Sequence, residues 1–372
     1  MHIDEAVMLT QDRLAQEGST MGELLGHFRS STSRILIGDP EWERILKCAG
    51  HLPITMGALP FGFELPLQSR RPEADFGVSL ASGTAAAAFF EQRRRRNRSD
   101  GVARAITKLF GQMDEEDSSL REIAGRKLML EYDIGSAKES ERLMPGMFLR
   151  PGERPILGAC GQVNDVVAVV DALVSCVGWK LKNAERKHVE GVYLAQPEDT
   201  RMDSFGIFPS RSRSIRLAVM GFKSRRDLGS YLGNLGWPGR FQSVESVIAR
   251  FSERVNIVRT GVNVDVSEHG VGPTLGLTLI VKQRYTKDSR YWLDGLTDWD
   301  PFLNALGQED IVMSGKLAAL ADWVSKPKTL FGKSGQFILL RGIHHIKLVI
   351  SDDQFKEAKA YVFLVLSAAV AT

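Results

Sequence analysis

The sequence predicts an α+β protein, a closed antiparallel β-barrel of about ten strands built from repeated αββα units with the helices outside. Three observations predict this fold. Segments that alternate apolar and polar residues recur in pairs along the chain. Segments with helical periodicity lie between these pairs, which gives a repeating order of helix, strand, strand. The strand faces opposite the apolar ones carry Lys, Arg, Glu, Asp and Tyr.

Size and composition fit an ordinary globular protein. The 372 residues allow one large domain or two smaller ones, and 43% hydrophobic residues support a sizeable core. A net charge of +3 gives no strong field, so we expect no nucleic-acid partner. The three cysteines show neither an even number nor zinc-type spacing, which indicates a reducing compartment. No signal peptide or apolar run of membrane-spanning length is recognisable, so we expect a cytoplasmic protein without a membrane span.

The chain divides, in our interpretation, into an N-terminal segment (residues 1–74) and a barrel domain (residues 75–372). Residues 3–30 favour one or two helices, and Glu41–Cys48 continues a helical pattern. Residues 51–72 are rich in Gly and Pro, so we expect them to be irregular.

The first predicted strand pair is weak and consists of Phe76–Leu80 and Ala85–Phe90. The run Arg93–Arg98 that follows is typical of a solvated surface. Asp100 is placed to cap a helix that continues through Phe110.

The alternation becomes clear from residue 128 onward. Leu128–Ile134 places Glu131 and Asp133 on the face opposite its apolar residues, and Gly146–Leu149 is its predicted partner strand. Val163–Val177 repeats valine at steps of three and four residues, which predicts a helix.

The next predicted pair is Val189–Ala195 with Ser214–Met220, in which Arg216 opposes an apolar face. Residues 228–235 and 244–251 then predict two helices.

Two further hairpins complete the predicted barrel. Thr260–Lys282 turns near Gly270–Pro273, and helices are expected between Asp298 and Trp323. The last hairpin pairs His344–Ile350 with Lys359–Leu364.

Antiparallel strands in this number tend to close into a barrel, because closure removes exposed edges. Helices between the hairpins would cover the apolar faces from outside. The charged faces would then point into the lumen. An open sheet with a solvated polar face is the alternative, and it stays open for each charged residue taken singly.

This order of elements resembles the ABBA, or PT-barrel, prenyltransferases, over roughly residues 75–366. The resemblance implies a transferase that binds a prenyl diphosphate in the lumen and ionises it to an allylic cation. The prenyl group would pass to an aromatic small molecule or a peptide side chain. Mg²⁺ accompanying the diphosphate is the one cofactor that the resemblance leaves open.

The resemblance also implies roles for the residues of the predicted lumen. The positive charge that would bind the diphosphate comes from Arg216, Lys282, Lys347 and Lys359. The side chains that would shield the allylic cation are Tyr193 and Tyr361, together with His345.

A carboxylate would take up the proton that the acceptor releases. Glu131 is the first candidate, and Asp133 or Asp265 is the second. Glu131 and Asp133 could instead be simple salt-bridge partners.

Two other functions remain open at this stage. The chain could be a peptide- or natural-product-tailoring enzyme, such as a cyclase, that uses the same lumen without a prenyl donor. It could also be a non-catalytic binding module, for which an open sheet with a basic face would be the sign.

Overall fold

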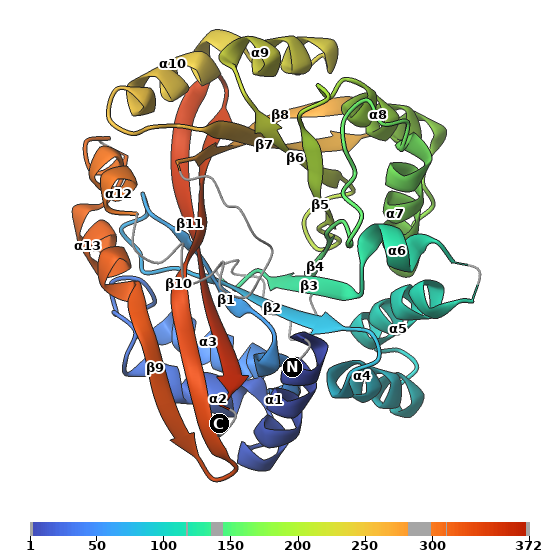
Figure 1. Cartoon of the computed structure of the whole chain (residues 1–372), viewed down its shortest axis with the longest axis vertical. Coiled ribbons are helices and arrows are strands. Elements are labelled where there is room, and N and C mark those ends of the chain that lie inside the picture. Colours follow the sequence, from blue (N-terminus) through green and yellow to red (C-terminus); the bar gives the residue numbers. More distant parts are fainter. Residues whose placement is uncertain (1–2, 117, 135–143, 282–298, 310, 370–372) are drawn as a thin grey trace.

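The computed structural model describes residues 3–116, 118–134, 144–281, 299–309 and 311–369. Within these residues, ten strands form a closed antiparallel ring with helices around the outside (Figure 1). The ring strands are β1 (Phe61–Pro66), β2 (Asp75–Ala81), β3 (Lys127–Tyr132), β4 (Gly146–Leu149), β5 (Arg201–Ile207), β6 (Ile215–Phe222), β7 (Arg259–Ser267), β8 (Gly270–Ile280), β10 (Gly335–Ser351) and β11 (Gln354–Ala368). The predicted ten-stranded barrel is therefore confirmed.

The ring closes where its first and last strands meet. β1 pairs with β11, so that Phe61 lies opposite Leu364, and β10 pairs with both β8 and β11. Among the strands that the structure describes, β9 (Ser325–Gly332) pairs with β10 alone, and it lies outside the ring.

Helices cover the outer surface of the barrel and the extension that β9, β10 and β11 form beyond it (Figure 1). They are α1 (Ile3–Glu17), α2 (Met21–Arg29), α3 (Asp39–Ala49), the 3₁₀ helix η1 (Ile54–Ala58), α4 (Ala85–Arg96), α5 (Gly101–Asp114), α6 (Leu120–Ala124), α7 (Val163–Cys176), α8 (Asn183–Leu194), α9 (Arg225–Asn234), α10 (Phe241–Ser252), α12 (Asp300–Leu306) and α13 (Ser314–Trp323). Asp100 accepts a hydrogen bond from the Ala103 backbone N–H and caps α5, as predicted. None of these helices, within the described residues, is long and apolar enough to cross a membrane.

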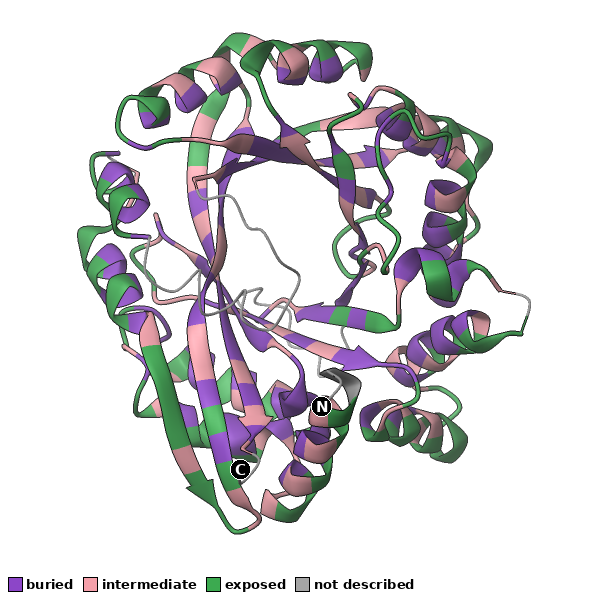
Figure 2. Cartoon of the chain, in the orientation of Figure 1, coloured by how far each residue is buried: buried purple, intermediate pink, exposed green. Residues whose placement is uncertain are grey.

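The strands bury their apolar faces under the helices and turn their polar faces inward. On β7, Val262, Val264 and Val266 are fully buried, whereas Asn263 and Asp265 are only half-buried. Figure 2 shows the same alternation along several of the ring strands. The hydrophobic core therefore lies between the sheet and the helices, and the charged side chains of the strands point into the barrel interior.

The β10–β11 hairpin is longer than the predicted one. Its turn consists of Asp352 and Asp353, whose φ angles of 50° and 59° are those of a type I′ turn. Aspartate tolerates this left-handed conformation better than most residues, because its short side chain bonds locally. The two strands then pair from Ser351 and Gln354 down to Phe337 and Ala368.

Two predicted strands are wrong. Ala85–Phe90 lies in helix α4, because four alanines are strong helix formers and Thr84 caps the helix at Ala87. Val189–Ala195 lies mostly in helix α8, where Glu185, Val189, Val192 and Tyr193 are buried at helical spacing.

Three strands were missed: β1 and β5 in the ring, and β9 outside it. β1 lies in the Gly- and Pro-rich stretch that we expected to be irregular, where Phe61, Phe63 and Leu65 nonetheless alternate. β5 contains a bulge between Met202 and Ser204 that breaks its alternation. The β7–β8 turn lies at Glu268 and His269, two residues before its predicted start.

Candidate functional site

A buried cluster of charges on β1, β10 and β11 forms the centre of the candidate site. Glu64 of β1 lies opposite Tyr361 of β11, and Lys347 of β10 lies opposite Lys359 of β11. The Lys359 ammonium donates to the Glu64 carboxylate at 2.7 Å, and the Lys347 ammonium lies 3.9 Å from it. Lys347 also donates to the Tyr361 hydroxyl. The register of three strands thus brings four polar side chains together.

Burial controls the protonation of this cluster. Glu64 and Lys347 are only 6% and 7% exposed. Burial opposes ionisation of Glu64, but Lys347 and Lys359 outweigh it and hold the pKa of that carboxyl well below its usual range. Burial lowers the pKa of Lys347 to about 8, against the attraction of Glu64. Glu64 therefore stays ionised at neutral pH, whereas Lys347 loses its proton more easily than an exposed lysine does.

A second group of charges lies on the β3 side and in the loop between β5 and β6. Arg211 bonds Asp133 at 2.7 Å and Glu131 at 3.3 Å. Arg216 of β6 makes a two-pronged bond to Asp265 of β7, with both distances 2.8 Å. Such bidentate pairs fix the plane of the guanidinium.

Phe208 supports both of these arginines. The guanidinium carbon of Arg211 lies 4.0 Å, and that of Arg216 4.7 Å, from the Phe208 ring centroid. Phe148 packs edge-on against the same ring at 5.1 Å. The aromatic pair therefore holds two cations beside the inner face of β4 and β6 by cation–π contact.

Carboxyl groups crowd together on β1, β2 and β3. Burial and the Glu64 charge raise the pKa of Glu131 to about 7, and burial with Glu64 and Asp133 raises that of Asp75 to about 6. Several carboxylates this close cannot all ionise easily. A carboxyl with a pKa near 7 can accept a proton or return it at neutral pH.

Tyr361 provides an aromatic surface within the cluster. The His345 ring stacks on it at 4.2 Å with an interplanar angle of 9°, and the Lys347 ammonium lies 4.7 Å from its centroid. Cations and aromatic faces thus lie side by side at this point.

The structure brings most of the predicted site residues to the barrel interior. They are Glu131, Asp133, Arg216, Asp265, His345, Lys347, Lys359 and Tyr361. Tyr193 is a correction: it lies on helix α8 outside the ring, and its hydroxyl bonds the backbone of Leu157 and Gln162. Lys282 lies outside the described residues. The chemical roles given to these residues stay predictions.

Glu64, Asp75, Arg211 and Phe208 were missed. Glu64 lies in the Gly- and Pro-rich stretch, but its place between Phe63 and Leu65 in an alternating run was a usable signal. Asp75 immediately precedes the predicted strand at Phe76. Arg211 and Phe208 lie in a loop, where no sequence periodicity predicts which way a side chain points.

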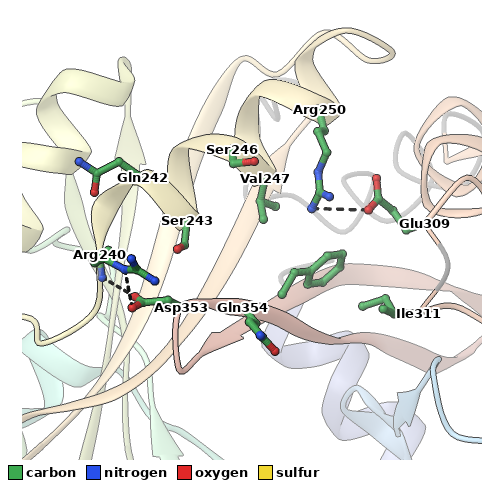
Figure 3. A pocket seen from close by; sticks show the side chains of 11 residues that line it. Arg240, Gln242, Ser243, Ser246, Val247, Arg250, Glu309, Ile311, Asp353 and Gln354 are labelled. Carbon is green, nitrogen blue, oxygen red and sulfur yellow. Dashed lines mark hydrogen bonds and ion pairs between the residues drawn. The ribbon is translucent and has the colours of Figure 1, made fainter.

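A groove lies elsewhere, between helix α10, the β10–β11 turn and residues Glu309 and Ile311 (Figure 3). It has a volume of about 720 Å³ and contains none of the inner-face charges described above. Arg240 bonds Asp353 at 2.7 Å on one side, and Arg250 approaches Glu309 at 3.5 Å on the other. Across the part of the chain that the structure describes, no three His, Cys, Asp or Glu side chains are placed to hold a metal ion.

Comparisons with known proteins address the fold. No protein-family model matches the chain, and no curated protein matches it. The apo form of the prenyltransferase PriB is similar in structure, with 13% identity, 94% of this chain and 96% of that chain covered, and a TM-score of 0.52. The chain has the prenyltransferase barrel fold.

Two further solved structures that are similar to this chain have TM-scores below 0.5. PriB in its ternary complex with L-tryptophan and dimethylallyl thiolodiphosphate is 13% identical, with 98% of this chain and 96% of that chain covered and a TM-score of 0.48. The 6-dimethylallyltryptophan synthase from Micromonospora olivasterospora, in complex with DMASPP and Trp, is 13% identical, with 97% of each chain covered and a TM-score of 0.46.

Proposed function

We propose that the protein is a prenyltransferase that moves an allylic group from a prenyl diphosphate to an aromatic or peptide side-chain acceptor inside the barrel. One observation carries the proposal: clustered cations and a stacked Tyr361–His345 pair line the interior of a barrel whose fold matches that of a prenyltransferase. The fold alone would allow other activities, so the proposal depends on this chemistry of the inner face.

The diphosphate would bind between Arg216, Lys347 and Lys359. These cations are close enough for Arg216 and Lys359 to lower the pKa of Lys347 by repulsion. Each is already hydrogen-bonded, Arg216 to Asp265 and Lys359 to Glu64, so their positions are fixed before a ligand arrives. Preorganised cations stabilise the negative charge that develops on a departing diphosphate.

The allylic cation would form next to Tyr361. When the carbon–oxygen bond breaks, its electron pair leaves with the diphosphate and the allyl carbon becomes positive. The ring faces of Tyr361 and His345 would attract that charge. Burial of the surrounding groups keeps bulk water from competing as the nucleophile.

Glu131 would complete the reaction. The acceptor forms its new bond to the allyl carbon and loses one proton, which the Glu131 carboxylate accepts. A pKa near 7 suits that transfer at neutral pH. Charge and protons then balance, with diphosphate and prenylated acceptor as products.

A non-catalytic binding module would have an open sheet with a basic face. The ten ring strands are closed instead, so this alternative loses its support. A tailoring enzyme without a prenyl donor remains the alternative that experiment must separate from our proposal.

Calorimetric titration with dimethylallyl and geranyl thiolodiphosphates tests the proposal. We expect dissociation constants on the order of micromolar for wild type, and binding at least about tenfold weaker for Arg216→Ala and Lys359→Ala. Arg98→Ala, an exposed residue outside the barrel, is the matched control and should bind as wild type does. Absence of binding of both analogues, with and without Mg²⁺, would sink the donor assignment and favour the tailoring alternative.

A further inference from the structure

Three carboxylates of the inner face are candidates for the base that takes up the acceptor's proton, and arginine holds two of them tightly. Arg216 makes a two-pronged bond to Asp265, with both distances 2.8 Å. Arg211 makes a two-pronged bond to Asp133, through Nε at 2.7 Å and through Nη2. The same Nη2 also donates to Glu131, at the longer distance of 3.3 Å. Arg211 thus contacts both candidates next to β3, but it binds Asp133 more closely than Glu131.

Arg211 lies in the loop that joins β5 and β6, residues 208–214. The backbone N–H groups of Arg211 and Ser212 donate to the Phe208 carbonyl at 3.0 and 3.2 Å, which closes a turn. The guanidinium carbon lies 4.0 Å from the Phe208 ring centroid. The turn and the ring together direct this arginine toward β3, across the short strand β4 that separates β3 from β5.

A second arginine fastens the same loop to the helix layer. Arg213 donates to the Glu185 carboxylate of α8 at 2.9 and 3.2 Å. The Arg213 side chain is 37% exposed and that of Arg211 is 36% exposed, and each binds a buried carboxylate. The two arginines differ in direction, because Arg211 reaches the barrel interior whereas Arg213 reaches a helix outside the ring.

Glu131 is buried, so its charge depends on neighbouring groups rather than on water. Glu64 and Asp75 repel that charge, whereas Lys347 and Arg211 attract it. Arg211 is the cation that contacts the carboxylate directly, at 3.3 Å. The charged and titratable groups around Glu131 are Glu64 of β1, Asp75 of β2, Asp133 next to β3, Arg211 of the β5–β6 loop, Arg216 of β6, Lys347 of β10 and Tyr361 of β11.

We propose that Arg211 is a positioning residue that sets the proton affinity of Glu131, with Asp133 as its anchor. Asp133 draws the guanidinium toward itself, so Glu131 keeps a partial contact that lets it accept a proton and release it again. The chemical consequence rests on the proposed function, since the proton in question comes from the acceptor.

The arrangement predicts opposite effects for two substitutions. Arg211→Gln removes the contacting cation, so Glu131 should hold its proton more firmly. Asp133→Asn removes the competing anion and leaves Arg211 to turn toward Glu131, which should then hold its proton less firmly. A loop with a merely structural role would admit water in either variant, and hydration lowers the pKa of a buried carboxyl toward its ordinary value in both.

Carbon-13 NMR of the folded full chain, labelled at the glutamate side-chain carboxyl carbon, tests the proposal. The Glu131 resonance is assigned by its loss in Glu131→Gln, and its chemical shift is followed against pH. We expect a midpoint near 7 in wild type. The midpoint should rise by about one pH unit or more in Arg211→Gln and fall by about one unit in Asp133→Asn.

Arg213→Gln is the matched control, because it removes an equally exposed arginine from the same loop without touching the barrel interior. Its midpoint should equal that of wild type. A shift of the same direction in Arg211→Gln and Asp133→Asn overturns the proposal, and so does a shift in Arg213→Gln as large as that in Arg211→Gln. Should Arg211→Gln fail to fold, Arg211→Lys decides, since one ammonium replaces the two-pronged contact; its midpoint should rise by about half a unit, and no rise overturns the proposal.

The titration contains no prenyl donor, so its outcome is independent of the thiolodiphosphate measurements. Failure of both analogues to bind would remove prenyl transfer and leave the coupling of Arg211 to Glu131 intact. Unchanged midpoints alongside normal analogue binding would remove the role of Arg211 and leave prenyl transfer intact.

Discussion

The barrel interior and the groove beside α10 use the same type of ion pair in opposite surroundings. Lys359 and Glu64 are 2.7 Å apart inside the ring, and Arg240 and Asp353 are also 2.7 Å apart at the groove. The Glu64 side chain is 6% exposed, whereas that of Arg240 is 75% exposed. Water screens the outer pair, but the inner charges depend on one another for solvation. The distances in the two ion pairs are equal, so burial is the property that distinguishes the candidate site from the groove.

The largest expected effect comes from Glu64→Ala. Removing this carboxylate leaves Lys347 and Lys359 buried without their shared anion, which should lower the free energy of unfolding by about 3 to 5 kcal/mol. Urea denaturation at neutral pH measures this change. Because the pKa of Glu64 is lowered in the folded state, its contribution is present at neutral pH and is lost as pH falls well below 4.5. A loss no greater than that of Arg240→Ala would contradict the comparison.

Glu131→Gln tests how strongly a buried charge in the barrel interior affects diphosphate binding. Above pH 7 the wild-type carboxylate ionises and repels a diphosphate, whereas the glutamine side chain carries no charge at any pH. At pH 8 we therefore expect the variant to bind dimethylallyl thiolodiphosphate more tightly than wild type, by about tenfold. The difference should shrink at pH 6, where the wild-type carboxyl is protonated. Calorimetry at both values checks this, and an equal difference at both would contradict the raised pKa.

Phe208→Leu should have a smaller effect. The change keeps an apolar side chain under Arg211 and Arg216 but removes the aromatic face, which is worth about 1 kcal/mol for each contact. The lost contacts should lower the free energy of unfolding by about 1 to 2 kcal/mol, and thiolodiphosphate binding should weaken by about three- to tenfold because Arg216 is held less firmly. A loss of stability without a loss of binding would make Phe208 a packing residue only.

The smallest effect is expected at the groove. Arg240→Ala breaks an exposed pair, so neither the urea midpoint nor thiolodiphosphate binding should change measurably. A clear loss of binding would show that the groove communicates with the barrel interior.

The sequence predicted the ring because alternation and helical periodicity each report one local property. The β7 valines and Glu131 of β3 lie on the faces that the sequence pattern predicted for them. The turn between β10 and β11 lies in the gap between the predicted strands His344–Ile350 and Lys359–Leu364, although β11 already begins at Gln354. These features depend on short segments whose local conformation follows from their own residue pattern and is kept in the folded protein.

The remaining features depend on tertiary structure. Glu64 becomes the centre of the cluster only because β1 pairs with β11, almost 300 residues later in the chain. Tyr193 was misplaced because the apolar spacing of residues 189–195 fits a strand almost as well as a helix. Arg211 reaches Glu131 from a loop, and loop conformation leaves no period in the sequence.

The pairing of β1 with β11 also determines when the barrel can form during synthesis. Phe61 leaves the ribosome long before Leu364, its partner across the final seam. Until then the growing sheet has two open edges, and contacts of such long sequence separation form slowly. We expect chains that end before Gln354 to remain open and to be cleaved rapidly in pulse proteolysis, whereas the complete chain resists. The helices that pack on each earlier hairpin would then protect the unfinished sheet from other chains while its last strand is being made.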